Sequence, residues 1–259
     1  MSTTPITIGD TFALGEHRLL CADSRDAAAI KPFLAGQKVS LILSDPPYGV
    51  AYVEGKEAFT KKSKTAHAPI ANDQLQTREQ YKKFTKVWLD AVRPFLAKKN
   101  AAYIFGSDTQ LFAMREGIED AGFHFGQMLF WLKTAGVLSR LDYLPAHELI
   151  FYAWHGTHEF RKSKESSILL CPKPARSKAH PTMKPMSLVR RLILNSSKTE
   201  EVVYDAFLGS GTTLLACEQT RRKCFGVEID PHYCQVIIDR FEKATGIKAV
   251  KLSSPISHG

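Results

Sequence analysis

A short segment, Ser44-Asp45-Pro46-Pro47-Tyr48, carries groups suited to chemistry on a flat, nitrogen-bearing ring, and it directly follows the apolar run Val39 to Leu43. Each proline fixes its own φ, and Pro47 also restricts Pro46 to extended conformations, so this loop is stiff. Neither proline has an N–H group. The segment therefore presents hydrogen-bond acceptors, which are the Asp45 carboxylate and the nearby backbone carbonyls.

Such a loop suits an aromatic amine, whose nitrogen is a poor nucleophile because its lone pair is delocalised into the ring. Two acceptors on the two amine hydrogens localise that pair, and Asp45 can take or relay the departing proton. Tyr48 adds a flat face on which an extruded base can stack. A Pro-Pro turn beside an acid is also an ordinary loop, but the strand before it and the aromatic ring after it favour a binding site.

A second segment, Asp205-Ala206-Phe207-Leu208-Gly209-Ser210-Gly211-Thr212-Thr213, follows the apolar run Glu201 to Tyr204 and opens a helical pattern. A glycine turn of this kind brings the backbone close to a ligand and aims helix N-terminal N–H groups at an anion. No Gly-Lys-Ser/Thr follows, so the turn is not a P-loop. The carboxylate of a methionine-type ligand is then the natural anion.

Glu228 ends the next apolar run, Lys223 to Glu228, about twenty residues after the glycines. In nucleoside-binding α/β units an acid at this place accepts hydrogen bonds from ribose hydroxyls. An ordinary acid at a strand end is the alternative interpretation of Glu228, and the preceding glycine turn favours the binding role.

Apolar runs and helical patterns alternate along the chain and form the scaffold for these motifs. The strands expected besides those above are His17–Ala22, Ala101–Phe105, Phe125–Trp131 and Glu148–Ala153, and the helices are Arg78–Phe95, Asp108–Ala121, Ser187–Asn195 and Pro231–Thr245. The alternation predicts an α/β fold with a doubly wound, mainly parallel sheet, and the 259 residues are expected to form a single domain.

The formal net charge of +9 attracts polyanions, which fits a protein that binds nucleic acid and equally fits a generally basic surface. Without a targeting segment or a long apolar stretch, we expect a cytoplasmic protein that associates with the nucleoid through DNA and not with membranes. The five cysteines are scattered without a Cys-x-x-Cys pair. Free thiols are therefore expected, several of them buried, with neither disulfides nor a metal site.

Two stretches interrupt the alternation. Residues 51–77 have little periodicity and are expected to form a mobile loop or lid after the Asp45 strand. Residues 155–179 form a basic insertion of low regularity. The alternative interpretation of this stretch is a solvated charged loop without a binding role. Both are candidates for contact with phosphates, through Lys56, Lys61, Lys62 and Lys64 in the first and Arg161, Lys162, Lys164, Lys173, Arg176 and Lys178 in the second.

Together these motifs resemble the DNA amino-methyltransferases, which methylate adenine N6 or cytosine N4, over nearly the whole chain. Asp45–Tyr48 resembles the catalytic motif of that family, and Asp205–Thr213 resembles its S-adenosyl-L-methionine loop. The catalytic motif comes first, and His180-Pro181-Thr182-Met183-Lys184-Pro185 lies just before the cofactor loop. This order is similar to that of the circularly permuted beta class, and the stretch Tyr143–Phe151 is similar to phage-type methylases associated with ParB-like modules.

The resemblance implies a Rossmann-like methyltransferase fold, S-adenosyl-L-methionine as cofactor, double-stranded DNA as substrate, and a homodimer as a common assembly. Asp23 is expected near the cofactor adenine and Glu228 near its ribose. The methionine end is expected to contact Asp205, Phe207, Gly209, Gly211 and Thr212, with Thr182 and Lys184 on the cofactor side, while Asp45, Pro46, Pro47 and Tyr48 form the catalytic motif. This chain has Ala206 and Leu208 where the family usually has proline and glycine, which reduces backbone freedom at Leu208 and predicts weaker binding.

Several other activities fit the sequence less well. Methylation of cytosine C5 needs a Pro-Cys nucleophile, and this chain has only the reversed Cys171-Pro172. RNA and protein-glutamine methyltransferases usually place the glycine loop first. An aspartate at position 45 is more typical of adenine than of cytosine-N4 enzymes in the resembling family, so we expect adenine N6 methylation. Cytosine N4 methylation and a catalytically silent DNA-binding decoy are the alternatives.

Overall fold

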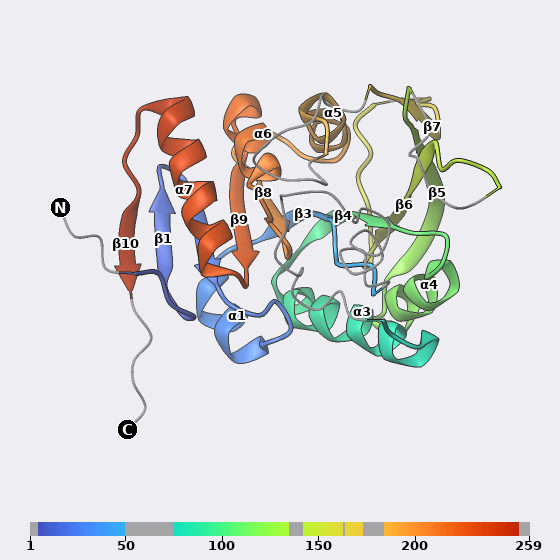
Figure 1. Cartoon of the computed structure of the whole chain (residues 1–259), viewed down its shortest axis with the longest axis horizontal. Helices are drawn as coiled ribbons and strands as arrows, with labels where there is room; N and C mark the ends of the chain where they lie inside the picture. Colours follow the sequence, from blue (N-terminus) through green and yellow to red (C-terminus); the bar gives the residue numbers. More distant parts are fainter. Residues whose placement is uncertain (1–4, 50–74, 135–141, 163, 173–183, 254–259) are drawn as a thin grey trace, which may run out of the picture.

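A computed structural model of the chain describes residues 5–49, 75–134, 142–162, 164–172 and 184–253, and a mixed sheet runs through them (Figure 1). In the described part the sheet has ten strands in the order β10-β1-β2-β9-β8-β3-β4-β6-β5-β7. The strands are β1 (Thr11–Leu14), β2 (His17–Cys21), β3 (Val39–Ser44), β4 (Leu96–Gly106), β5 (His124–Leu132), β6 (His147–Trp154), β7 (Ile168–Leu170), β8 (Val202–Asp205), β9 (Lys223–Glu228) and β10 (Val250–Ser253).

The centre of the sheet is parallel, as the sequence predicts. Strands β2, β9, β8, β3 and β4 pair in parallel, and all six residues of β3 are buried. This is the pattern of a strand covered on both faces. The two sides of the sheet are antiparallel, with β10 and β1 beyond β2 and with β6 and β5 beyond β4.

Helices cover both faces of the sheet (Figure 1). One group consists of α1 (Ala27–Phe33), α3 (Arg78–Val92) and α4 (Leu111–Asp120), and the other of α5 (Met186–Ser196), α6 (Thr212–Thr220) and α7 (Pro231–Thr245), while a short 3-10 helix η1 (Arg93–Phe95) follows α3. Successive strand residues point to opposite faces. Leu41 and Leu43 of β3 accordingly pack in the cluster of the second helix group, and Ile42 packs in the cluster of the first.

Local sequence signals explain where several helices begin and end. Thr77 and Gln80 form a capping box at the start of α3, in which each side chain accepts a hydrogen bond from the other residue's backbone N–H. Asp230 caps α7, Pro231 occupies its first turn, and the left-handed Gly246 ends it. The predicted range Pro231–Thr245 is therefore confirmed to the residue.

Other predicted boundaries need correction. Helix α4 begins at Leu111 and not at Asp108, whose side chain instead accepts from the Thr109 N–H. Strands β1, β7 and β10 were not predicted from the sequence. The basic insertion is more regular than expected, because its residues Ile168–Leu170 form β7 against β5.

All five cysteines are free and buried, which confirms the expectation of unpaired thiols. In the described ranges no helix has the length and apolar character needed to cross a membrane.

Candidate active site

The two motifs singled out in the sequence lie next to each other at one edge of the sheet. β3 and β8 are neighbours, so the loops at their carboxyl ends, which begin at Asp45 and Ala206, emerge side by side. Both contribute to a cavity of about 50 Å³ that is also lined by Phe105, Lys184 and Gly209. In open α/β sheets, ligands usually bind at the carboxyl ends of parallel strands, at the point where the strand order reverses. The two motifs therefore share one site.

Hydrogen bonds within the site fix the loop after β3. The Tyr48 hydroxyl donates to Asp45 Oδ1 at 2.9 Å, and the Lys184 ammonium donates to Asp45 Oδ2 at 2.5 Å. The Tyr81 hydroxyl of α3 donates to the Pro47 carbonyl at 3.1 Å. Ser44 also anchors the neighbouring loop, because its hydroxyl accepts from the Ala206 N–H at 2.9 Å.

The pKa of the Asp45 carboxyl is raised above its ordinary value. Burial is the main cause, Glu148 adds to it, and the Lys184 ammonium opposes it. Burial also raises the pKa of Tyr48, with Asp45 as a further cause, so this phenol stays protonated and donates its hydrogen bond.

The second loop has the geometry of an anion site. Gly209 and Gly211 have φ values of 53° and 83°, in the left-handed region that favours glycine. Gly211 is the N-cap of α6, and no side chain caps that helix end. The N–H groups of the first turn are thus oriented toward the loop side, where a ligand carboxylate is favoured.

Leu208 stands where the resembling family usually has glycine, and it does not adopt the left-handed backbone conformation. Its N–H donates to the Val227 carbonyl at 2.9 Å. Its side chain occupies the space that Gly226 leaves open, since a Cβ atom at Gly226 would lie 2.4 Å from Leu208 Cδ2. The expected loss of backbone freedom therefore causes no strain at this position.

Two acids lie buried beside the glycine loop. Burial raises the pKa of Asp205 to about 7 and that of Glu228 to about 7. Glu228 accepts from the Gly209 N–H at 2.8 Å and from the Asp230 N–H at 2.9 Å, so one of its oxygens holds the glycine loop and the other holds the turn before α7. Its predicted contact with a ribose would use the remaining lone pairs.

Other residues predicted for the cofactor lie at the same edge or outside the described ranges. Asp23 follows β2, which neighbours β9, and it pairs with Arg25 at 2.6 Å. The Phe207 ring lines the cavity and packs on Phe84 and Trp88 of α3. Thr212 begins α6. Thr182 lies outside the described residues.

Lys184 lines the same cavity as the glycine loop, so its predicted contact with the cofactor stays a prediction. Its ammonium is buried at the Asp45 carboxylate, so its observed contact is with the catalytic motif. It also lies 3.1 Å from Glu148 Oε2, and Glu148 pairs in turn with Lys133 at 2.8 Å. Sequence reasoning placed Glu148 on a strand but missed its part in this cluster. A carboxylate in an otherwise apolar strand was the available signal.

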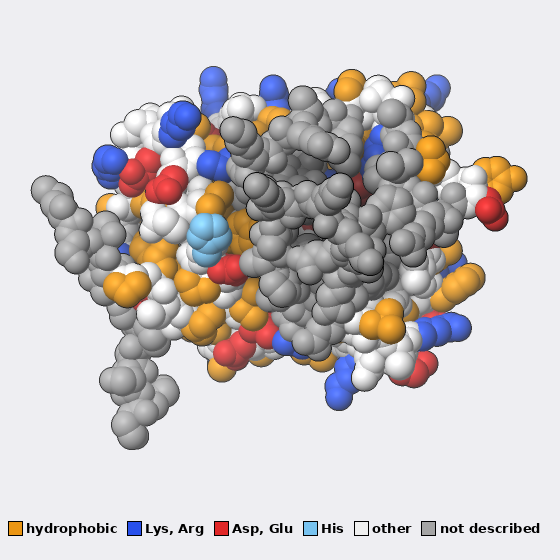
Figure 2. All heavy atoms as spheres, viewed as in Figure 1, with side chains coloured by type: hydrophobic (Ala, Val, Ile, Leu, Met, Phe, Trp, Pro, Cys, Tyr) orange, Lys and Arg blue, Asp and Glu red, His pale blue; other side chains and the backbone are white. Residues whose placement is uncertain are grey.

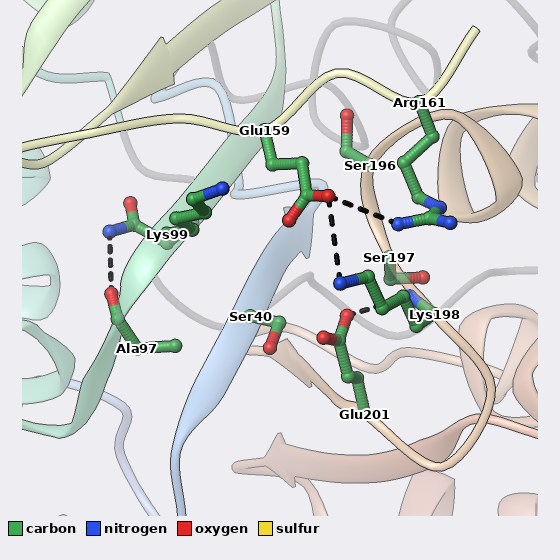
Figure 3. A pocket seen from close by; sticks show the side chains of 10 residues that line it. Ser40, Ala97, Lys99, Glu159, Arg161, Ser196, Ser197, Lys198 and Glu201 are labelled. Carbon is green, nitrogen blue, oxygen red and sulfur yellow. Dashed lines mark hydrogen bonds and ion pairs between the residues drawn. The ribbon is translucent and has the colours of Figure 1, made fainter.

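Among the predicted phosphate contacts that the structure describes, Arg161 lies away from this edge. Arg161 lines a second cavity of about 210 Å³ together with Ser40, Ser197 and Lys198, and its guanidinium pairs with Glu159 at 3.2 Å (Figure 3). Ser40 lies at the start of β3 and Asp45 just past its end, about 16 Å apart at ~3.3 Å per residue. Arg161 is therefore at the opposite edge of the sheet from the candidate active site.

Lys162 lies 3.8 Å from the Glu165 carboxylate, and Lys164 is exposed with a left-handed φ of 59°. The other predicted contacts, Lys56, Lys61, Lys62, Lys64, Lys173, Arg176 and Lys178, lie outside the described residues.

Solved structures of DNA methyltransferases share this fold. The complex of M1.HpyAVI with SAM matches with a TM-score of 0.62 and 24% identity over 86% of this chain and 98% of that one. The TTHA0409 putative DNA modification methylase of Thermus thermophilus, complexed with S-adenosyl-L-methionine, matches with a TM-score of 0.62 and 20% identity, over 93% and 100% of the two chains. The cytosine-N4-specific PvuII DNA methyltransferase matches with a TM-score of 0.66 and 16% identity, over 92% and 87%.

The predicted fold class is thereby confirmed as that of the S-adenosylmethionine-dependent DNA methyltransferases. The family model for N6 and N4 DNA methylases matches residues 39–239, which include both motifs. The chain belongs to this DNA methylase family, and S-adenosylmethionine, the cofactor expected from the sequence, is the one that the family uses.

Two relatives of known activity are similar over most of the chain. The type II methyltransferase M.HpaI of Haemophilus parainfluenzae is 26% identical over 88% of this chain and 74% of its own length. The type II methyltransferase M.HinfI of Haemophilus influenzae is 25% identical over 81% of this chain and 65% of its own length. The chain thus spans just under two thirds of the second relative.

Proposed function

We propose that the protein transfers a methyl group from S-adenosyl-L-methionine to the exocyclic N6 of adenine in double-stranded DNA, at specific sites. The observation that carries this proposal is the cavity shared by Asp45 and the glycine loop, with both motifs at the carboxyl ends of adjacent strands. An amine held at one loop and a methyl donor held at the other would meet across that cavity.

The described residues fit the cofactor. The uncapped start of α6 behind the left-handed Gly211 suits the carboxylate of its methionine part. Asp205, Phe207, Gly209, Gly211 and Thr212 would hold that end, Glu228 the ribose and Asp23 the adenine. When bound, the cofactor supplies a methyl group on a sulfonium, an electrophile that needs no covalent enzyme intermediate.

The chemistry assigned to this chain's own residues is positioning and proton transfer. The Asp45 carboxylate and the Pro46 carbonyl would accept the two amine hydrogens and so localise the nitrogen lone pair. Asp45 then takes or relays the proton that the methylated nitrogen loses. The Tyr48 ring supports the extruded base, which must leave the duplex to reach the site.

Adenine is favoured over cytosine because the catalytic motif begins with aspartate. Cytosine N4 methylation, the specificity of the PvuII enzyme, is the alternative, since the same acceptors serve either amine. We also propose that the motif order is that of the permuted beta class, that residues 1–259 form a single methyltransferase domain, and that residues 51–77 and 155–179 contribute to target recognition. A role in a restriction-modification system is proposed from the similarity to two type II methyltransferases.

A transfer assay tests the proposal. The purified protein is incubated with unmethylated plasmid DNA and cofactor carrying a tritiated methyl group, and the DNA is then digested to nucleosides and separated by chromatography. We expect label in N6-methyldeoxyadenosine. Label in N4-methyldeoxycytidine would establish the alternative, and cofactor and DNA binding without transfer would support the silent decoy.

The variant Asp45→Ala tests the catalytic motif. We expect its turnover to fall by at least about 10³-fold, within the range for loss of a positioned proton acceptor, while cofactor and DNA affinities stay within about tenfold. Asp239→Ala, a change at an exposed acid of α7, is the matched control and should retain activity. Near-normal methylation by Asp45→Ala would refute the role of Asp45.

A further inference from the structure

A line of four alternating charges runs from the interior of the protein to the catalytic carboxylate. Lys133, just after β5, lies 2.8 Å from Glu148 Oε1 on β6, and Glu148 Oε2 lies 3.1 Å from the Lys184 ammonium. Lys184, which precedes α5, completes the line with its 2.5 Å hydrogen bond to Asp45 Oδ2. Three separate segments of the chain thus contribute to the surroundings of Asp45.

The two central members are shielded from water. Lys184 is 8% exposed, and its ammonium lies 4.9 Å from the centre of the Phe105 ring and 5.8 Å from that of Tyr48. The Glu148 carboxylate is mostly buried. A buried lysine is stable only with compensating charge, and both carboxylates raise the pKa of Lys184 against the effect of burial, so the ammonium stays charged.

Lys184 is shared unequally between its two carboxylates. Its ammonium lies 2.5 Å from Asp45 Oδ2 and farther, at 3.1 Å, from Glu148 Oε2. Glu148 is therefore a second acceptor placed beside the first. A small shift of the ammonium toward Glu148 would free Asp45 Oδ2 while the ammonium itself stays paired with a carboxylate.

The other groups around Asp45 do not duplicate this arrangement. Tyr48 donates to Oδ1 from the same loop, and Tyr81 of α3 donates to the Pro47 carbonyl and not to the carboxylate. Asp205, at the end of β8, lies close enough for Asp45 to raise its pKa. Among the described residues that face Asp45, Lys184 is thus the cation that balances its charge.

We propose that Lys184 and Glu148 are positioning residues for methyl transfer, in which Glu148 anchors the ammonium and the ammonium sets the charge and orientation of the Asp45 carboxylate. This inference rests on the proposed function. The incoming amine competes with Lys184 for Asp45 Oδ2, and Glu148 receives the displaced ammonium. Asp45 then meets the amine as an ionised acceptor although it lies in a cavity that disfavours its charge.

Two variants with opposite electrostatic effects test this inference. The rate of methyl transfer is expected to fall at low pH as Asp45 becomes protonated, and this fall is the acidic limb of the pH profile. Lys184→Met removes the cation, which raises the pKa of Asp45, so the acidic limb moves to higher pH. Glu148→Gln removes an anion, so that limb moves to lower pH. Shifts of about one pH unit or more are expected, as for other charges this close to a carboxyl group. The measurement is the single-turnover rate of tritiated methyl transfer to DNA between pH 5 and 9, with cofactor saturating.

The double variant Lys184→Met/Glu148→Gln guards against failure to fold, because it removes one charge of each sign. Its acidic limb should lie between those of the single variants, and all variants are checked by thermal unfolding. Lys248→Met, which removes a surface lysine paired with Glu242 on α7, is the matched control and should keep the wild-type profile.

The outcomes separate this inference from the proposed function. Absence of methyl transfer by the wild-type protein refutes the proposed function itself. An active wild type whose folded Lys184→Met and Glu148→Gln variants lose rate without a shift of the limb, or shift it in the same direction, overturns the positioning role. A purely structural role would lower the rate equally at every pH.

Discussion

At the scale of single residues, the protein buries ionisable groups where a ligand is expected. Asp205 is 4% exposed, and its pKa is raised to about 7 by burial, against an ordinary value near 3.9 in an unfolded chain. The folded state therefore holds a proton on Asp205 that the unfolded state loses at lower pH. The contribution of this group to the free energy of unfolding is fully present below the pKa that it has in the unfolded chain, and it is lost as the pH rises through about 7.

The variant Asp205→Asn should remove this pH dependence. Asparagine keeps an acceptor for the Phe207 N–H, which Asp205 Oδ1 binds at 3.1 Å, but it cannot ionise. The free energy of unfolding of the variant, relative to wild type, should therefore increase by about 2 kcal/mol between pH 5 and 7. Urea denaturation of the ligand-free proteins at several pH values measures this. A difference that stays constant with pH would contradict the assignment.

At the scale of elements, Gly226 of β9 and Leu208 of the glycine loop form a complementary pair. The variant Gly226→Ala would place a methyl group 2.4 Å from Leu208 Cδ2, so the buried Leu208 side chain of the loop would have to shift. Overpacking of this kind costs about 1–3 kcal/mol, and we expect cofactor affinity to fall by about tenfold, as measured by titration calorimetry.

A matched control distinguishes an effect of loop geometry on cofactor affinity from an effect of lower overall stability. Gly126 of β5 is also tightly packed, since a Cβ atom there would lie 2.2 Å from the Trp154 ring. The variant Gly126→Ala should lower the melting temperature similarly but leave the affinity for S-adenosyl-L-methionine unchanged. Equal loss of affinity in both variants would show that loop geometry is not responsible.

The sequence predicted the elements that have strong local signals. The buried parallel strands β3 and β8 and the capped helix α7 follow from apolar runs, proline and glycine, so each motif could be placed at the end of a strand in advance. Short edge strands such as β7 could not be predicted, because three residues carry too little periodicity. The Lys184–Glu148 contact was missed because it joins distant segments, and no local pattern specifies such a pairing.

At the scale of the whole molecule, positive charge exceeds negative charge by +9, which favours association with DNA. In the view of Figure 2, lysine and arginine side chains on the described surface are scattered and do not form one continuous patch. Many of the described cations are also paired with carboxylates, as Arg161 is with Glu159. The net charge alone therefore does not locate the DNA-binding surface.

The salt dependence of DNA affinity can locate it. Counterion release predicts that a protein with six or more phosphate contacts loses about 10³-fold in affinity between 50 and 200 mM salt. Because Arg161 lies at the sheet edge opposite Asp45 and Lys162 is near Glu165, the variant Arg161→Ala/Lys162→Ala should leave the slope of log Kd against log salt almost unchanged.

The variant Lys61→Ala/Lys62→Ala/Lys64→Ala changes the segment that follows the catalytic motif in sequence, and each lost phosphate contact should lower that slope by about 0.9. Fluorescence anisotropy with a labelled duplex measures both variants. If the first variant lowered the slope and the second did not, DNA would approach from the edge that carries Arg161. An extruded base would then have to span the length of β3 to reach Asp45, which is incompatible with the proposed direct transfer.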